Sequence, residues 1–405
     1  MNRNRKSYCI NSLHLALQNL LFVLFLLLIA PFSAFAQGTT LPASTVFDTP
    51  AKTVILIDET SNSILFAKDA NAIVQPASLA KLMTAELVFK GLADGSLNLS
   101  QTFKVSENAW RTGGAPSGGA AMFAALKSEI AIKDLLRGLI VQAGNDAAIV
   151  LAEGISGSEE KFVVEMNARA LELGLASTKF ANATGLPDDR AQITMRDMVK
   201  LARHVQKTYP NFVGIFAEPE FLWNKINQRN RNPLLNKNIG ADGFMTGFTE
   251  ETGYAIVATA KLNGRRVFLG MGGMESAEQR SVEAQKIINW GLTDFESIEI
   301  VPADSQIGLA DVYGGMAGEV ALKTGAATSV LMPKNRAGVF SARITYRGPL
   351  LAPIEKGAEV ASLGIWNGEV LTQEIPLYAG SSIEVGPMRD RALGALAELA
   401  FGWLR

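Results

Sequence analysis

A serine and a lysine lie three residues apart in Ser78-Leu79-Ala80-Lys81, and together they could act as a nucleophile and its base. On a helix this spacing places both side chains on one face, one turn apart. A serine alone is a weak nucleophile, and a buried, neutral lysine is one of the few bases other than histidine that can activate it. Pro76 favours a helix start at this point. The pattern therefore predicts covalent serine chemistry.

The same spacing recurs at Ser158 and Lys161, where both intervening residues are acidic. We interpret this second match as a charged, solvated helix start. An apolar face continues after Lys81 through Leu82 and Met83, so the first match has the better context for a buried amine.

The N-terminal residues have the pattern of an export signal. Three basic residues precede an apolar run over 20–30, and Ala34-Phe35-Ala36 supplies the small-x-small site that signal peptidases cut. The run is too short to span a membrane, and Pro31 prevents its continuation as a regular helix. We expect a signal peptide over 1–36 and export to the periplasm.

Composition narrows the chemistry further. The chain has one cysteine and two histidines, and Cys9 and His14 both lie in the expected signal. Cysteine nucleophiles, disulfides and thiolate zinc sites are therefore excluded from the mature chain. A catalytic zinc site normally uses one to three histidines, so a zinc peptidase is disfavoured as well. We interpret His204, in an amphipathic stretch over 194–207, as an ordinary helix residue, and we expect no metal or cofactor.

The formal net charge of −1 gives no basic field for nucleic acid, so we expect no nucleic-acid partner. After a linker over 37–51, strand-like runs at 53–58 and 63–68 precede helical patterns at 132–153, 159–173 and 194–207. A hairpin around Asn263-Gly264 and a helix over 277–290 complete this part of the chain. Strands at both ends with helices between them predict an α+β domain over 52–294, whose sheet is completed from both ends of the segment.

From residue 295 onward, short β-rich runs are separated by Pro and Gly turns, which predicts a small all-β sandwich over 295–386. The predicted strands lie at 320–322, 329–332, 340–346, 360–366 and 371–377. The last stretch, 387–405, is predicted to be an amphipathic helix, with Leu393, Leu396, Ala400 and Trp403 on one face. Such a stripe suits a helix lying on a membrane surface, although packing on the sandwich is the alternative.

Residues 76–84 resemble the nucleophile motif of low-molecular-mass penicillin-binding proteins, the serine D-alanyl-D-alanine carboxypeptidases of peptidase family S11. The resemblance covers essentially the whole mature chain. It continues through residues 110–114, 144–147, 180–187, 242–243 and 246–247. It implies a DD-peptidase/β-lactamase-like catalytic domain, followed by the β-sandwich and the terminal helix.

The family uses three motifs, Ser-x-x-Lys, Ser-x-Asn and Lys-Thr-Gly. The first is intact here. The second aligns with Ala143-Gly144-Asn145, so the amide is kept but the hydroxyl that would relay protons is missing. The third aligns with Met245-Thr246-Gly247, so a methionine replaces the lysine that would fix the substrate carboxylate.

Two other segments restore a formally complete set, Ser106-Glu107-Asn108 and Lys323-Thr324-Gly325. Ser106 precedes the helix expected to lead into the second motif, and Lys323 lies in the predicted β-rich domain. Short patterns recur by chance, so we interpret both as coincidences.

The resemblance implies that Ser78 attacks the carbonyl between two terminal D-alanines of a peptidoglycan stem peptide while Lys81 takes its proton. Asn145 would hold the substrate amide, with Thr246, Gly247 and Phe248 as the substrate-binding strand. The backbone N–H groups of Ser78 and Phe248 would form the oxyanion hole. β-Lactam antibiotics would be covalent inhibitors, and the outer face of the inner membrane would be a partner of the C-terminal helix.

Three functions fit the sequence. The first is a D-Ala-D-Ala carboxypeptidase, active or attenuated. The second is a degenerate relative that binds penicillin or peptidoglycan without hydrolysis, which Ala143 and Met245 favour. The third is a β-lactamase, against which the β-sandwich and terminal helix argue, because an antibiotic hydrolase that diffuses freely needs neither.

Overall fold

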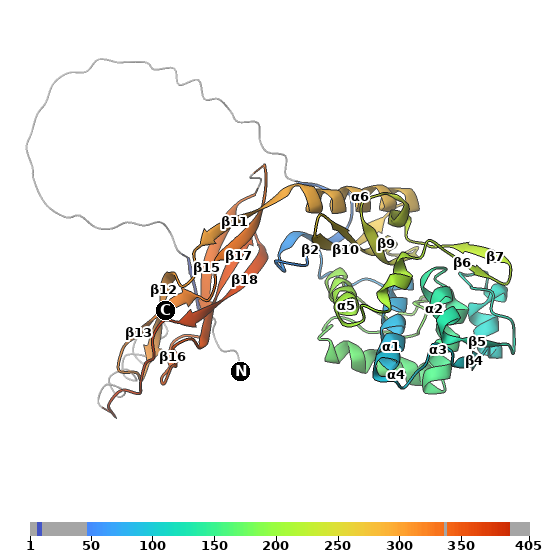
Figure 1. Ribbon diagram of the computed structural model, residues 1–405, viewed down its shortest axis with the longest axis horizontal. Helices are drawn as coiled ribbons and strands as arrows, with labels where there is room; N and C mark the ends of the chain where they lie inside the picture. The colour runs from blue at the N-terminus through green and yellow to red at the C-terminus, as the bar shows by residue number, and fades with distance from the viewer. Residues whose placement is uncertain (1–5, 10–46, 336–337, 389–405) are drawn as a thin grey trace, which may run out of the picture. The chain divides into compact units, whose positions relative to one another are not determined.

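The computed structural model describes residues 6–9, 47–335 and 338–388, which form two units (Figure 1). The larger unit is Asp48–Glu296. The smaller contains the described residues from Ser297 onward together with strand β1 (Lys6–Cys9). Residues 10–46 and 389–405 lie outside the described part, so most of the predicted signal peptide and the predicted C-terminal helix cannot be compared with it.

The larger unit is built on an antiparallel sheet in the order β3-β2-β10-β9-β8, so β3 and β8 are its edge strands. Early and late segments of the chain pair, as the sequence predicts, because β2 lies between β3 and β10. Strand β2 is buried along its whole length. The strands are β2 (Thr53–Asp58), β3 (Ile64–Lys68), β8 (Ala241–Thr249), β9 (Gly253–Leu262) and β10 (Arg265–Met274).

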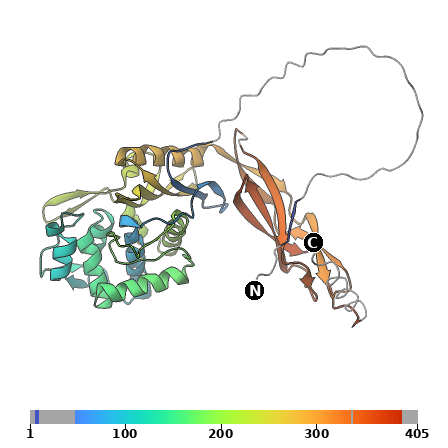
Figure 2. The same ribbon diagram turned by 180° about the vertical axis from the view of Figure 1, so that it is seen from behind.

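Helices cover both faces of this sheet. A Cβ on Gly270 of β10 would meet Val199 of α5 (Met195–Thr208), so that face packs on α5. Gly291 of α6 (Ala277–Thr293) packs against Leu56, which points to the opposite face. In Figure 2, which shows the molecule from behind, α6 is the gold helix that runs along the sheet. Burial on both faces explains why β2 reads as a continuous apolar run.

A helical layer and two small two-stranded sheets complete the larger unit. The layer contains α1 (Lys81–Asp94), α2 (Ile132–Ile140), α3 (Asn145–Ser156) and α4 (Glu159–Glu172). The two-stranded sheets, which the sequence did not predict, pair β4 (Thr102–Lys104) with β5 (Glu129–Ala131) and β6 (Glu220–Trp223) with β7 (Ile226–Arg229).

One prediction for the helices is wrong. The helix predicted over 132–153 is two helices, α2 and α3, separated by residues 141–144. Ala143 has φ +58°, in the left-handed region that a helix interior does not use. Gly144 turns the chain where a side chain would collide with Gly138 O and Met122 N. The apolar periodicity continues through this break, which is why the pattern hid it.

A buried ionic cluster ties α1 to α4 and α5. Glu86, with no exposed surface, accepts hydrogen bonds from Arg169 and from the Tyr209 hydroxyl at 2.9 Å. His204 Nε2 lies 3.3 Å from the same carboxylate oxygen. Burial holds the pKa of His204 below its ordinary value. His204 is thus a helix residue, as predicted, with a structural contact that its amphipathic context did not reveal.

The smaller unit is β-rich. A seven-stranded sheet has the order β1-β15-β17-β18-β13-β12-β16, and a two-stranded sheet pairs β11 with β14. The strands are β11 (Phe295–Val301), β12 (Gln306–Tyr313), β13 (Glu319–Thr324), β14 (Thr328–Pro333), β15 (Phe340–Tyr346), β16 (Leu350–Leu351), β17 (Glu359–Asn367) and β18 (Val370–Ala379).

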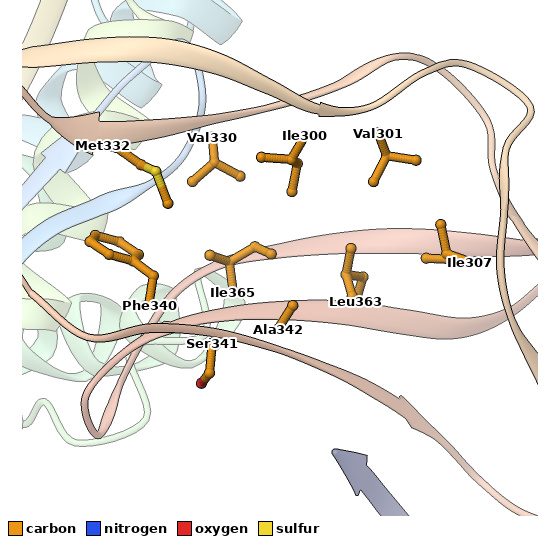
Figure 3. A pocket seen from close by; sticks show the side chains of 10 residues that line it. All are labelled: Ile300, Val301, Ile307, Val330, Met332, Phe340, Ser341, Ala342, Leu363 and Ile365. Atoms are coloured by element: carbon orange, nitrogen blue, oxygen red, sulfur yellow. The ribbon is translucent and has the colours of Figure 1, made fainter. Parts of the chain in front are cut away.

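An apolar cavity of about 450 Å³ separates the two sheets. In Figure 3, Val330 and Met332 of β14 face Phe340 and Ile365 across it, while Ser341 points away. The alternation along β15 follows from the two-residue period of a strand. None of the helices within residues 47–335 and 338–388 is long and apolar enough to cross a membrane.

The left-handed conformation of Ala143 leads to a stability prediction. Relief of left-handed strain favours glycine there by about 1 kcal/mol, while loss of the buried methyl costs about 0.8 kcal/mol. Ala143→Gly should therefore be nearly neutral in urea denaturation. Ala168→Gly, at an exposed position inside α4, should cost about 0.5–1 kcal/mol. Equal losses at the two positions would contradict the assigned conformation of Ala143.

Candidate active site

Ser78 and Lys81 meet as their spacing predicts. Ser78 lies in a short 3-10 helix (Ala77–Ala80) that leads directly into α1, whose first residue is Lys81. The Lys81 Nζ is 3.0 Å from the Ser78 Oγ, and it donates a 2.6 Å hydrogen bond to the Thr184 carbonyl. Lys81 has no exposed surface, whereas Ser78 is half-buried. A nucleophile open to a ligand therefore sits against a base that water does not reach.

The turn that presents Ser78 depends on close backbone packing. Ala77 has φ +47°, a strained conformation for alanine, immediately before the nucleophile. Its carbonyl oxygen occupies the place where a side chain on Gly185 would go, so only glycine fits there. The Thr84 hydroxyl donates to the Ala183 carbonyl at 2.8 Å, which fixes the same loop to α1.

The Asn182 side chain aims the Thr184 carbonyl at Lys81. Its Oδ1 accepts hydrogen bonds from the backbone N–H groups of Thr184 at 3.2 Å and Gly185 at 2.6 Å, and from the Thr184 hydroxyl at 2.8 Å. The sequence placed this segment within the family resemblance but assigned no role to Thr184. The signal available was an Asn two residues before a Thr-Gly pair, which is typical of a side-chain-capped turn.

Burial sets the protonation state of the lysine. It lowers the pKa of Lys81 to about 7, and the negative charge of Asp146 opposes this effect only in part. About half of the molecules therefore carry a neutral amine at neutral pH. A neutral amine beside a serine hydroxyl is the state that a general base requires.

Asn145 of the second motif is the first residue of α3 and is almost fully buried. Its backbone N–H donates to the Ala120 carbonyl at 2.7 Å. Gly113 packs so closely on the Asn145 backbone that a Cβ would lie 2.7 Å from its carbonyl carbon. Ala143 is buried two residues earlier, where the family motif has a hydroxyl. These contacts fix the backbone of Asn145 at the start of α3, and Ala143 has no hydroxyl that could relay a proton.

The third motif lies on the edge strand β8, beside the nucleophile. A Cβ on Gly247 would be 3.0 Å from the Ala77 Cβ and 3.4 Å from the Ser78 nitrogen, so glycine lets the strand approach closely. Thr246 is largely buried on this strand, and Met245 is 2% exposed and belongs to the apolar core.

Phe248, the next residue on β8, is half-exposed and stacks on Tyr254 with ring centroids 4.3 Å apart. The candidate oxyanion donors Ser78 N and Phe248 N therefore come from two segments that meet at Gly247.

The two alternative matches have other contacts. The Ser106 Oγ accepts the Ala109 N–H at 2.9 Å and so starts the turn that follows it. Lys323 lies on β13 of the smaller unit and pairs with Asp304 at 3.1 Å. Ser106 therefore starts a turn, and Lys323 forms an ion pair within the smaller unit.

Comparisons with known proteins agree with this arrangement. Residues 39–273 match the family described as D-alanyl-D-alanine carboxypeptidase, peptidase S11. Residues 295–385 match the C-terminal domain of penicillin-binding protein 5. The chain therefore belongs to the S11 family of D-alanyl-D-alanine carboxypeptidases, with a catalytic domain followed by the β-rich domain that its sequence predicts.

Relatives align over most of the chain. It is 35% identical to D-alanyl-D-alanine carboxypeptidase DacC of Escherichia coli, over 89% of this chain and 90% of the relative. It is 34% identical to DacA of Haemophilus influenzae over 77% and 80% of the two chains.

Solved structures agree as well. Penicillin-binding protein 5 of H. influenzae superimposes with a TM-score of 0.67 and 32% identity, covering 84% of this chain and 99% of the other. Penicillin-binding protein D2 of Listeria monocytogenes, in its ampicillin-bound form, superimposes with a TM-score of 0.55 and 27% identity. The match covers 62% of this chain and 100% of the other.

The burial of Lys81 leads to a prediction about stability and pH. Its folded pKa is about 7 and its ordinary pKa is 10.5, so between these values the unfolded chain binds more protons and the stability of the wild type rises with pH. Lys81→Met removes this dependence. Its stability relative to the wild type should therefore fall by up to about 1.4 kcal/mol per pH unit between pH 7 and pH 10. Urea denaturation at several pH values measures the difference, and a constant difference would contradict a depressed pKa.

Proposed function

We propose that this protein is an exported serine D-Ala-D-Ala carboxypeptidase that removes the terminal D-alanine of peptidoglycan stem pentapeptides through an acyl-enzyme on Ser78. The observation that carries the proposal is the 3.0 Å contact between the Ser78 Oγ and a fully buried Lys81 whose pKa is lowered to about 7. The names of its relatives, which are D-alanyl-D-alanine carboxypeptidases, support the substrate class.

The reaction follows from this contact. Lys81 accepts the Ser78 proton as the Oγ bonds to the carbonyl carbon between the two D-alanines. The N–H groups of Ser78 and Phe248 stabilise the oxyanion, and Asn145 holds the substrate amide. The C–N bond then breaks, and the leaving amine takes up a proton. Water hydrolyses the ester and releases the shortened peptide.

Turnover is attenuated in this proposal. Loss of a positioned proton-transfer group such as the missing hydroxyl at Ala143 typically lowers rates on the order of 10²–10⁴-fold. Loss of a charge-assisted hydrogen bond to the substrate carboxylate, as at Met245, costs roughly 1.5–3 kcal/mol. The nucleophile, its base and the backbone oxyanion donors do not depend on either side chain, so substantial residual catalysis is compatible with both losses.

Arg231 is a candidate cation to replace the missing lysine. Its backbone N–H donates to the Val141 carbonyl at 3.2 Å, which places it beside the loop that carries Ala143 and Asn145. Its side chain is exposed, and no carboxylate of the described residues lies within 4.0 Å of its guanidinium. We propose that it attracts the C-terminal carboxylate of the stem peptide.

The alternative function is binding without hydrolysis. The packing of Met245 in the apolar core favours it, because a core methionine offers a carboxylate no partner. A third function, β-lactam hydrolysis, would use the same acyl-enzyme with faster deacylation.

Acylation and turnover should separate in this protein. A fluorescent penicillin should label the wild type slowly, and Ser78→Ala should abolish the label. Release of D-alanine from a pentapeptide should be far weaker, and Ala143→Ser with Met245→Lys should raise it more than the single changes together, because both side chains serve one site. Arg231→Ala should raise the KM for the pentapeptide.

Each outcome discriminates among the three functions. Brisk D-alanine release by the wild type would contradict attenuation. Absence of any label would favour the binding protein, and rapid loss of the label with release of hydrolysed penicillin would favour a β-lactamase.

We also propose that the protein is periplasmic and attached to the inner membrane through residues 387–405. Truncation before Met388 should move it from the membrane to the soluble fraction after cell fractionation. A chain with residues 389–405 in scrambled order keeps the composition but loses the apolar stripe, and it should be released as well. Unchanged partitioning of the truncated chain would contradict the anchor and favour a helix packed on the β-rich domain.

A further inference from the structure

Strand β15 of the smaller unit is covered on one side only by the short strand β1. On its other side, all 7 residues of β15 pair with β17 without a register shift, so the edge is long and regular. The pairing with β1 is antiparallel and places Lys6 opposite Tyr346 and Cys9 opposite Arg343. The edge of β15 therefore accepts an added antiparallel strand.

Export removes the strand that covers this edge. β1 lies within residues 1–36, the proposed signal peptide, so the mature protein lacks it. Without β1, alternate N–H and C=O groups of β15 have no neighbouring strand to pair with. A long, regular edge of this kind pairs readily with an extended segment of another chain.

The side chains along β15 indicate what an added strand must carry. Ile344 and Tyr346 are buried in the core of the smaller unit, and Ser341 points away from the cavity (Figure 3). Since side chains alternate along a strand, Arg343 lies on the outer face with Ser341. Its guanidinium carbon is 5.0 Å from the centre of the Trp366 ring, and its Nε has no hydrogen-bond partner among the described residues.

The edge has a positive charge that the smaller unit does not neutralise. No carboxylate of the described residues lies within 4.0 Å of the guanidinium of Arg343 or of the exposed Arg347, which follows β15. An opposite charge directly across an antiparallel pair is stabilising, and a like charge is destabilising. The residue opposite Arg343 in an added strand should therefore be acidic, and the residue opposite Ile344 should be apolar.

Two other occupants fit this edge less well. A second copy would bring its own β15, and so its own Arg343 and Arg347, against the arginines of the first. The linker after the signal peptide has no acidic residue over 37–46, and Pro42 would interrupt its pairing. An acidic segment of another protein has neither disadvantage.

We propose that the edge of β15 is a docking site for an extended, acidic segment of a partner protein, which joins the sheet as an antiparallel strand and places a carboxylate opposite Arg343. The site opens when the signal peptide is removed, so this inference rests on the proposed export. The catalytic residues of the larger unit take no part in it.

Peptides with the sequence of residues 4–11 test the site on the mature chain, residues 37–405. Two of them, with Cys9→Asp and Cys9→Lys, differ only in the charge opposite Arg343. The dissociation constant of the Asp peptide should be lower by roughly two- to thirtyfold. The Asp peptide should also slow hydrogen exchange at those amides of 343–346 that do not pair with β17. A peptide with Tyr8→Pro should protect none of them.

Matched variants of the chain separate the charge of the edge from other effects. Arg343→Glu should reverse the order of the two peptides, and Arg343→Gln, which serves if the first variant does not fold, should make them nearly equal. Lys133→Glu makes the same change of net charge at an exposed position of α2, and it should keep the wild-type order. An unchanged order in Arg343→Glu, or a reversal in Lys133→Glu, would overturn the proposal.

The mature chain without peptide tests the other occupants. Its amides at the edge should exchange fast. Slow exchange there would overturn the proposal, because the edge would already be covered. The cover would be residues 37–46 if analytical ultracentrifugation shows a monomer, and a second copy if it shows a dimer.

Export and activity are measured separately in the same preparations. If the mass of the exported protein shows that residues 6–9 remain, the proposed export fails and the docking site fails with it. Labelling of Ser78 by a fluorescent penicillin reports the proposed activity, and Arg343→Glu should not change it. Peptide binding without any label would contradict the activity and leave the docking site supported.

Discussion

The site depends on one constraint, which is that an amine must be kept dry beside a serine hydroxyl. Water would hold Lys81 protonated, so the chain encloses it beside the 3-10 helix and the loop at 182–185 until no surface is exposed. The gain is a base that is half neutral at neutral pH. The cost is a buried amine that destabilises the fold, a common compromise at catalytic centres.

Close backbone packing makes this enclosure possible. Ala77, just before the first motif, and Ala143, the first residue of the second, adopt left-handed conformations. Gly185 and Gly247 let neighbouring segments lie directly on the nucleophile turn. The hydrogen bonds that hold Ser78 and Lys81 involve neither the side chain at position 143 nor that at position 245. A chain can therefore lose the relay hydroxyl and the lysine of the family motifs while it keeps the geometry of nucleophile and base.

Residue spacing along the chain predicted the features that depend on short segments of sequence. The Ser78–Lys81 contact, the strands β2, β3, β9 and β10 of the sheet and helices α4, α5 and α6 follow from period and turn residues. Contacts between distant segments could not be predicted in this way. Thr184 reaches Lys81 across 103 positions, and the buried Asp146 accepts a hydrogen bond from a loop more than twenty residues earlier. The break at Ala143 was missed because an alanine in the sequence does not indicate a positive φ, whereas a glycine often does.

Lys81 should be a base that is about half neutral near physiological pH, and its titration can be observed directly. In protein labelled with 13C at the lysine Cε, an NMR titration should show one lysine with a midpoint near pH 7, and that signal should be absent from Lys81→Met. If every lysine titrates above about pH 9, as ordinary lysines do, the amine is not desolvated and the account is contradicted.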